Sequence, residues 1–185
     1  MANRGIKICL VVSSLFLIIV AIVTVALFLT IFKPKNPGIF LHPVNLDDFE
    51  LLSSSSAAIS PLNVMITIVN PNYGNFKYKN STGYINYNGS IIAEVPIVTS
   101  SVPARSIANV SASAGFMTQK LSADNNFLED IEDGAFNLTA NATLPGKVSM
   151  LKIFKLKAKV YISCDIVFNI TSVEVDSTCI SKIKL

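Results

Sequence analysis

The residues of this chain that could do chemistry are few, and they do not assemble into a catalytic set. His42 is the only histidine in 185 residues, so neither a histidine-based metal cluster nor a Ser-His-Asp arrangement can form. Four carboxylates cluster further along: Glu129, Asp130, Glu132 and Asp133. They lack the Asp-x-Asp-x-Asp-Gly spacing of a calcium loop, so we interpret them as a solvated helix face. The sequence predicts no catalytic residue, no cofactor and no metal site.

Modification chemistry is better represented, because the chain contains six Asn-x-Ser/Thr sequons. Such sequons are glycosylated only in a secretory lumen and only when exposed. All six follow the long hydrophobic segment near the N-terminus, so they predict a non-cytosolic domain after that segment. The candidate asparagines are Asn80, Asn88, Asn109, Asn137, Asn141 and Asn169.

The three cysteines occur in two settings. In an oxidising lumen Cys164 and Cys179 could form a disulfide that closes a loop of about 15 residues, worth roughly 3 kcal/mol in the chain-entropy model. Two small buried thiols are the alternative. Cys9 stands alone at the membrane edge, where it is either a candidate for S-acylation or, as we prefer, an inert membrane cysteine.

The hydrophobic segment 8–32 contains 25 residues without a charged side chain. As a helix it would reach roughly 37 Å, more than the roughly 30 Å hydrocarbon core of a bilayer. A cleaved signal peptide usually has an apolar part of only about 7 to 15 residues, and a small core cannot cover a helix that is apolar on every face. We therefore expect a single transmembrane helix that is retained as an anchor.

The net charge of +3 comes from the flanks of this helix. These flanks carry Arg4, Lys7, Lys33 and Lys35. The remaining 11 basic and 12 acidic residues give 11 − 12 = −1, which leaves no nucleic-acid footprint. We expect a cytosolic N-terminus at 1–7, a transmembrane helix at 8–32, a juxtamembrane linker at 33–38 and an extracytosolic domain at 39–185.

The domain after the linker is predicted to be built from short strands. Apolar and polar residues alternate in four segments: 62–69, 108–114, 136–143 and 154–164. In the middle two the sequon residues Asn109, Asn137 and Asn141 fall on the outward face. Asn88-Gly89, between two apolar runs, predicts a type I′ hairpin turn.

One short helix is expected at 123–133, with Ser122 as its cap and Gly134 as its terminator. Many short strands bounded by Gly, Pro, Asn and Ser, with one helix, predict an all-β fold, namely an antiparallel β-sandwich of two sheets.

The fourth strand carries a ladder of lysines on its outward face: Lys155, Lys157 and Lys159. These lysines could contact anionic phospholipid headgroups or acidic polysaccharide. We prefer the interpretation of a charged strand that resists edge pairing, because the domain as a whole is not basic.

Several short motifs, in this order, resemble plant late embryogenesis abundant proteins of the second group, including their membrane-anchored hairpin-induced and non-race-specific disease resistance-like members. The match covers nearly the whole chain. The motifs are Lys33-Pro34-Lys35, Leu46-Asp47-Asp48-Phe49, Asn70-Pro71-Asn72, Phe76-Lys77-Tyr78, Tyr87-Asn88-Gly89, the segment from Pro96 to Pro103, Gly146-Lys147-Val148, and the spaced Cys164 and Cys179.

The resemblance implies a fibronectin type III or immunoglobulin-like sandwich with one added helix, and a role in stress or defence at the plasma membrane. It implies no catalytic residues. Some relatives have a hydrophobic C-terminal tail, whereas this sequence ends in the polar Ser181-Lys182-Ile183-Lys184-Leu185.

Three functions follow as hypotheses. The first is a non-enzymatic, membrane-tethered binding or structural module at the plasma membrane, with its domain outside the cell and protein, cell-wall polymer or lipid as partner. The second, an enzyme, is disfavoured by the residue inventory. The third is binding of a lipid or other amphiphile between the two sheets, with the short helix as a lid.

Overall fold

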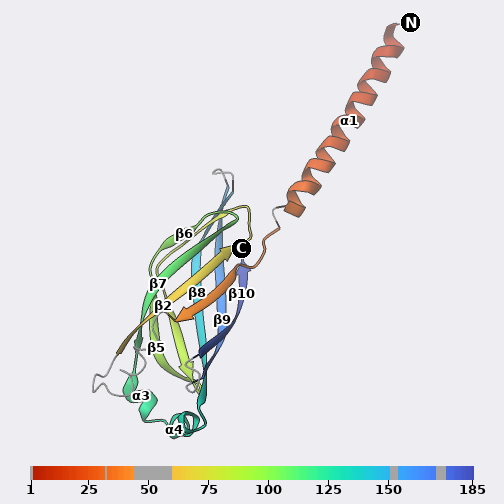
Figure 1. Cartoon of the computed structure of the whole chain (residues 1–185). Coiled ribbons are helices and arrows are strands. Elements are labelled where there is room, and N and C mark those ends of the chain that lie inside the picture. Colours follow the sequence, from red (N-terminus) through yellow and green to blue (C-terminus); the bar gives the residue numbers. More distant parts are fainter. Residues whose placement is uncertain (1, 32, 44–59, 151–153, 170–173) are drawn as a thin grey trace. The chain divides into compact units, whose positions relative to one another are not determined.

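The computed structural model describes residues 2–31, 33–43, 60–150, 154–169 and 174–185. The chain divides into two compact units, residues 1–34 and residues 35–185, coloured from red to blue along the sequence in Figure 1. The motif Leu46-Asp47-Asp48-Phe49 lies outside the described residues.

The first unit contains a single long helix, α1 (Ala2–Ile31). Within it the 27 residues Arg4–Thr30 are apolar and long enough to cross a membrane, by length and composition. Their large apolar side chains are exposed within the unit. This is the distribution expected of a helix whose solvent is lipid.

The second unit is all-β apart from two short helices. Its described strands form one ten-stranded antiparallel sheet. They are β1 (Gly38–Pro43), β2 (Ser60–Asn70), β3 (Asn75–Tyr78), β4 (Ser81–Tyr87), β5 (Ser90–Ile97), β6 (Ser100–Val102), β7 (Ser106–Phe116), β8 (Ala135–Met150), β9 (Phe154–Asn169) and β10 (Glu174–Lys184).

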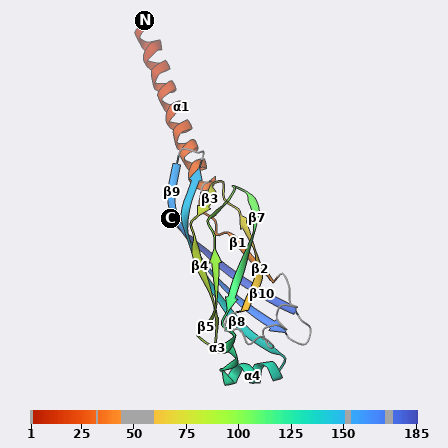
Figure 2. The ribbon, with the colours of Figure 1, turned by 90° about the vertical axis from the view of Figure 1, so that its left-hand side faces the viewer.

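The sheet folds over on itself into two layers, as the predicted sandwich requires. Strands β1, β2 and β7 form one layer, and β5, β4, β8, β9 and β10 form the other, with β3 and β6 beside the far half of β8. The layers are joined along one edge by a short ladder in which Ala93 and Glu94 of β5 pair with Phe116 and Gly115 of β7. At the opposite edge β10 lies beside β1, so the sandwich is nearly a closed barrel (Figure 2).

The local features predicted from the sequence appear at the expected places. Segment 62–69 lies within β2, which ends at Asn70, and the other three segments lie within β7, β8 and β9. Asn88 and Gly89 join β4 to β5 with φ of 50° and 81°, the positive values that a type I′ turn needs at both positions.

The helical region differs from the prediction in two ways. It contains α3 (Thr118–Ser122), which was not predicted, and α4 (Asn125–Glu132). The predicted cap, Ser122, is wrong: the Asp124 side chain accepts a hydrogen bond from the Asn126 backbone N–H and caps α4. Gly134, with φ of 83°, follows the end of the helix as predicted.

One inward position of β9 was also predicted wrongly. Leu156 is 42% exposed, although Ala158, Val160 and Cys164 of the same face are buried. Leu156 pairs with the buried Val148 of β8 but lies beyond the last β9–β10 pair, at Lys159, so no β10 residue covers its other side.

Candidate functional site

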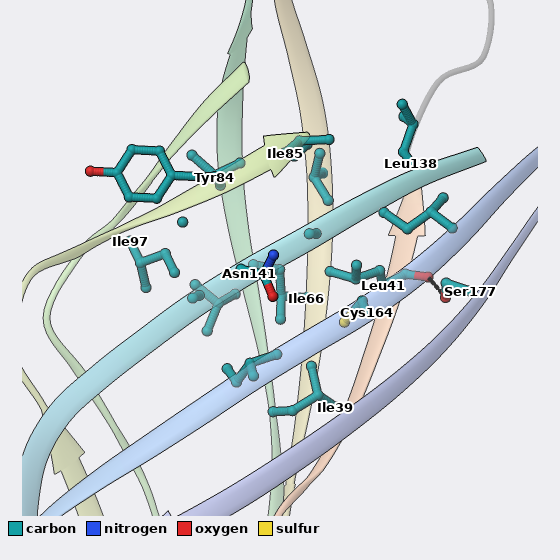
Figure 3. Close-up of a pocket in the computed structure, with 18 of the residues that line it drawn as sticks. Ile39, Leu41, Ile66, Tyr84, Ile85, Ile97, Leu138, Asn141, Cys164 and Ser177 are labelled. Carbon is teal, nitrogen blue, oxygen red and sulfur yellow. Dashed lines mark hydrogen bonds between the residues drawn. The ribbon is translucent and has the colours of Figure 1, made fainter. Parts of the chain in front are cut away.

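The interior of the second unit contains an apolar cavity of about 120 Å³. Its lining includes alternate residues of β2 on one layer, Leu62, Val64, Ile66 and Ile68. On the other layer it includes Ile162, Cys164, Ile166 and Phe168 of β9. Figure 3 shows Ile39, Ile66 and Cys164 around this space, each from a different strand. The period-two apolar pattern of the sequence therefore builds the walls of the cavity.

Small side chains leave the space unfilled. Gly83 of β4 pairs with Ala142 of β8, and the next inward residue of β8, Ala140, pairs with Cys164 of β9. All four line the cavity. At about 24 cal/mol per Å³, a void of 120 Å³ costs about 3 kcal/mol relative to a filled core. The protein thus gives up core stability at this place.

A cavity of this size and composition suits hydrocarbon better than water. Engineered cavities of about 150 Å³ lined by Leu, Ile and Phe stay dry and bind benzene. A buried water needs two to four polar partners, and the lining is almost entirely apolar. The space can therefore take a ring or a short stretch of acyl chain.

Tyr78, on β3, brings one polar atom to this interior. Its side chain is 0% exposed and lines the cavity, and its hydroxyl has no hydrogen-bond partner among the residues that the structure describes. Burial raises the pKa of Tyr78, and the side chain of Ser100, opposite it on β6, offsets part of that rise. Ser100 is thus the described polar side chain that bears on this hydroxyl.

One end of the interior is closed by α4. Phe127 of α4 packs edge-on against Tyr87, at 5.5 Å between ring centroids, and against Phe136, at 5.3 Å. Phe136 stacks in turn on Phe168, a cavity residue, at 5.0 Å. The Tyr87 hydroxyl donates a 2.7 Å hydrogen bond to Asp130. Burial, that hydrogen bond and the nearby carboxylates raise the pKa of Tyr87, so the hydroxyl stays protonated and α4 stays attached.

The long side of the cavity has a seam between β1 and β10. No described backbone ladder joins these two strands. They are held instead by a 3.1 Å hydrogen bond from the Ser177 Oγ to the Leu41 carbonyl, drawn in Figure 3, and by one from the Ser181 Oγ to the Pro37 carbonyl. Leu41 and Ser177 also line the cavity.

The modification candidates lie on the surface, apart from the disulfide. All six sequon asparagines are exposed, and the Thr171 of the Asn169 sequon lies outside the described residues. Cys164 and Cys179 are cross-strand partners on β9 and β10 and are joined by a disulfide. Cys9 is a free, exposed cysteine on α1.

The remaining candidates do not meet at one site. His42 is exposed on β1, and the described residues contain no group of three or more His, Cys, Asp or Glu that could hold a metal ion. Lys155, Lys157 and Lys159 are exposed on β9. β9 pairs with β8 along its length but with β10 only from Lys159 to Asn169. Lys155 and Lys157 therefore lie on a stretch with one side unpaired in the described ladders, and the interpretation of the lysines as edge protection stays a prediction.

Sequence reasoning missed the cavity itself. The strand faces that line the cavity were predicted to point inward. The cavity itself, however, depends on which small residues lie opposite each other in the sheet. Only the register of β4, β8 and β9 brings Gly83, Ala142 and Ala140 together. A run of small inward residues in β8 was the one available sign of it.

Comparison with known proteins gives weak structural likeness. No protein-family model matches the chain, and no curated protein sequence matches it. A crystal structure of a protein from Archaeoglobus fulgidus has a TM-score of 0.38 at 9% identity, covering 81% of this chain and 96% of that one.

Two solution structures are similarly distant. One, described as a late embryogenesis abundant protein, has a TM-score of 0.37 at 7% identity and covers 79% of this chain and 71% of that one. The other, a protein from Arabidopsis thaliana, has a TM-score of 0.35 at 10% identity, with 83% of both chains covered. Likeness at this level assigns no family.

Proposed function

We propose that this chain is a non-enzymatic, single-pass membrane protein whose β domain binds the hydrocarbon part of a lipid or similar amphiphile. The observation that carries the proposal is the apolar cavity of about 120 Å³ beside the β1–β10 seam. A short acyl segment or ring fits the cavity, and the remainder of the ligand would leave through the seam.

We also propose that the domain lies outside the cell at the plasma membrane, with the N-terminus in the cytosol. The six exposed sequon asparagines and the Cys164–Cys179 disulfide support this topology. The resemblance to membrane-anchored late embryogenesis abundant proteins supports a role in stress or defence, with protein partners at the plasma membrane or cell wall. Under this proposal, glycosidase treatment increases the gel mobility of the native protein, and an unchanged mobility with intact sequons would contradict the topology.

The ligand proposal is tested by cross-linking the full-length chain in nanodiscs with a fatty acid that carries a photoactivatable group on its acyl chain. The expected cross-links fall on peptides of β2, β8 and β9 that line the cavity. Excess unlabelled fatty acid should compete, because one cavity takes one chain. Cross-links confined to α1 would contradict the proposal, since the probe would then report only its presence in the bilayer.

Two substitutions in neighbouring strands provide the matched control. Ala140 of β8 points into the cavity, and Ser163 of β9 is exposed on the outer face. Ala140→Leu fills the space and should abolish cross-linking in β2 and β9, whereas Ser163→Leu should leave it unchanged. Equal cross-linking of the two variants would also contradict binding in the cavity.

A further inference from the structure

Lysines gather on the outer face of the second unit in two cross-strand rows. In the first row Lys77 of β3 stands opposite Lys147 of β8, which stands opposite Lys157 of β9. In the second, Lys159 of β9 stands opposite Lys184 of β10. No carboxylate stands opposite any of these lysines in the described ladders. Like charges in such pairs destabilise a sheet. The lysine rows therefore lower the stability of the fold, which suggests that they serve another purpose.

Most of the acidic residues that the structure describes lie toward the other end of the unit. Asp124, Glu129, Asp130, Glu132 and Asp133 belong to α4 or its caps. Asp165 of β9 and Asp176 of β10 lie in the halves of those strands that are nearer α4. Among the described residues, positive and negative charges are therefore separated along the length of the unit. This separation of charge gives the unit an electric dipole along its length.

The lysine rows lie at the end where the chain arrives from α1. The backbone N–H of Lys35 donates to Asn72 Oδ1 at 2.7 Å, and Asn72 Nδ2 donates to the Lys35 carbonyl at 2.7 Å. The next residue, Asn36, accepts a 3.1 Å hydrogen bond from the backbone N–H of Ile183, beside Lys184. These bonds attach the arriving segment to the β2–β3 turn and to the end of β10.

The tether from α1 to this end is short. Three residues separate Ile31, the last residue of α1, from Lys35. A fully extended chain gains at most about 3.6 Å per residue, so whatever the orientation of the two units, Lys35 stays within about 14 Å of the end of α1. If α1 spans a membrane, the headgroups are within reach of this end.

Exposed apolar and aromatic side chains lie at the same end of the unit as the lysines, with Leu156 on the face of β9 opposite Lys157. Tyr73, Ile107 and Leu156 are 48%, 65% and 42% exposed, and they lie on the β2–β3 turn, the start of β7 and the start of β9. The guanidinium of Arg105 lies over the Tyr73 ring at 4.6 Å. Basic residues mixed with Tyr, Ile and Leu suit the interface of a bilayer. An acidic polysaccharide would supply no apolar partner for Ile107 and Leu156.

We propose that this lysine end docks on anionic phospholipid headgroups of the membrane that holds α1. The lysine end comprises Lys77, Lys147, Lys157, Lys159 and Lys184 with Tyr73, Arg105, Ile107 and Leu156. It matches such a surface in charge, in apolar content and in distance from the anchor. The docking is independent of the cavity, so either proposal can fail while the other stands.

The test compares lysine acetylation of the full-length chain in two kinds of nanodisc, by mass spectrometry of the peptides. One contains phosphatidylcholine alone and the other about 30% phosphatidylserine, which supplies the anionic surface. Labelling of Lys147 and Lys157 should fall about threefold in the anionic nanodiscs. It should recover at about 1 M salt, where the screening length is only about 3 Å. Lys120 of α3, at the far end, should be labelled equally in both. Equal labelling of Lys147 in the two nanodiscs would overturn the proposal.

Charge reversal supplies a matched pair of variants. Lys157→Glu should remove the protection of Lys147, and it removes a like-charge pair, so the fold should be retained. Lys120→Glu makes the same charge change at the far end and should leave the protection intact. Loss of protection in both variants would overturn the proposal.

A further experiment tests acidic polysaccharide as the alternative partner of the lysine end. Polygalacturonate is added to the phosphatidylcholine nanodiscs, and acetylation is measured as before. The proposal expects little protection of Lys147 and Lys157 in this arm. If the polysaccharide protected these lysines and the anionic lipid did not, docking on lipid would be overturned.

Discussion

Two buried tyrosines differ in whether their hydroxyl has a partner. The hydroxyl of Tyr78 has none among the described residues, whereas that of Tyr87 donates to Asp130. An unsatisfied buried polar group costs about 1 to 3 kcal/mol. Tyr78→Phe should therefore raise the free energy of unfolding by about 1 kcal/mol, measured by urea denaturation of the full-length chain followed by near-ultraviolet circular dichroism. A decrease of similar size in the free energy of unfolding would instead mean that the hydroxyl has a hydrogen-bond partner in the folded protein.

The same tyrosines predict a dependence of stability on alkaline pH. Both have a raised pKa in the folded state, so the folded protein holds these protons more tightly than the unfolded chain. The stability that comes from these tighter protons is fully present below the ordinary tyrosine pKa of about 10. It is lost as the pH rises through the pKa values that the two tyrosines have in the folded protein. The urea midpoint should hold up to about pH 9 and fall above about pH 10. Tyr87→Phe should have a lower midpoint at neutral pH and a smaller alkaline fall; an alkaline fall as large as that of the native chain would contradict this account.

At the scale of elements, the cap of α4 gives a paired comparison. Asp124 accepts a hydrogen bond from the Asn126 N–H, while the Ser122 hydroxyl reaches only the Gln119 carbonyl, at 3.4 Å. Asp124→Ala should cost about 1 kcal/mol, the usual cost of losing such a cap. Ser122→Ala should change the unfolding free energy little. The reverse order in urea denaturation would show that the helix begins at Ser122.

Local patterns predicted most of the strands, and non-local pairing explains what they missed. The alternation in 62–69 and the Asn88-Gly89 pair specify a strand and a turn from adjacent residues. Strand β1 was not predicted, because its six residues follow a proline-rich segment and gain their ladder from β2, more than twenty residues away. The setting of the lysine ladder also depends on non-local pairing, since only the register with β10 shows that β9 is paired on both sides at Lys159 and on one side at Lys155 and Lys157.

The candidate site was predictable only in part. The inward faces of β2, β8 and β9 were assigned from their period of two, whereas the cavity between them was not. Its volume depends on Gly83 facing Ala142 across a ladder and on the closure of two layers. No local sequence window contains either property.

At the scale of the whole molecule, two layers enclose the cavity without closing it completely. They share a ladder of two residue pairs at one edge and side-chain hydrogen bonds at the other. Helix α4 closes one end through its aromatic contacts. A domain with a hollow core and a weak seam is suited to hold the apolar part of an amphiphile, and it stands a short tether away from the segment that can span a membrane.

The most direct measurement is native mass spectrometry of the full-length chain purified from its own membranes. The account predicts one bound acyl-containing molecule per chain, retained in Ser163→Leu and absent from Ala140→Leu. Ala140→Leu should also unfold at the same or higher urea concentration, because filling a cavity typically adds about 0.5 to 2 kcal/mol. A chain that carries no such molecule in any form, or one that keeps it in a folded Ala140→Leu variant, would contradict binding in the cavity.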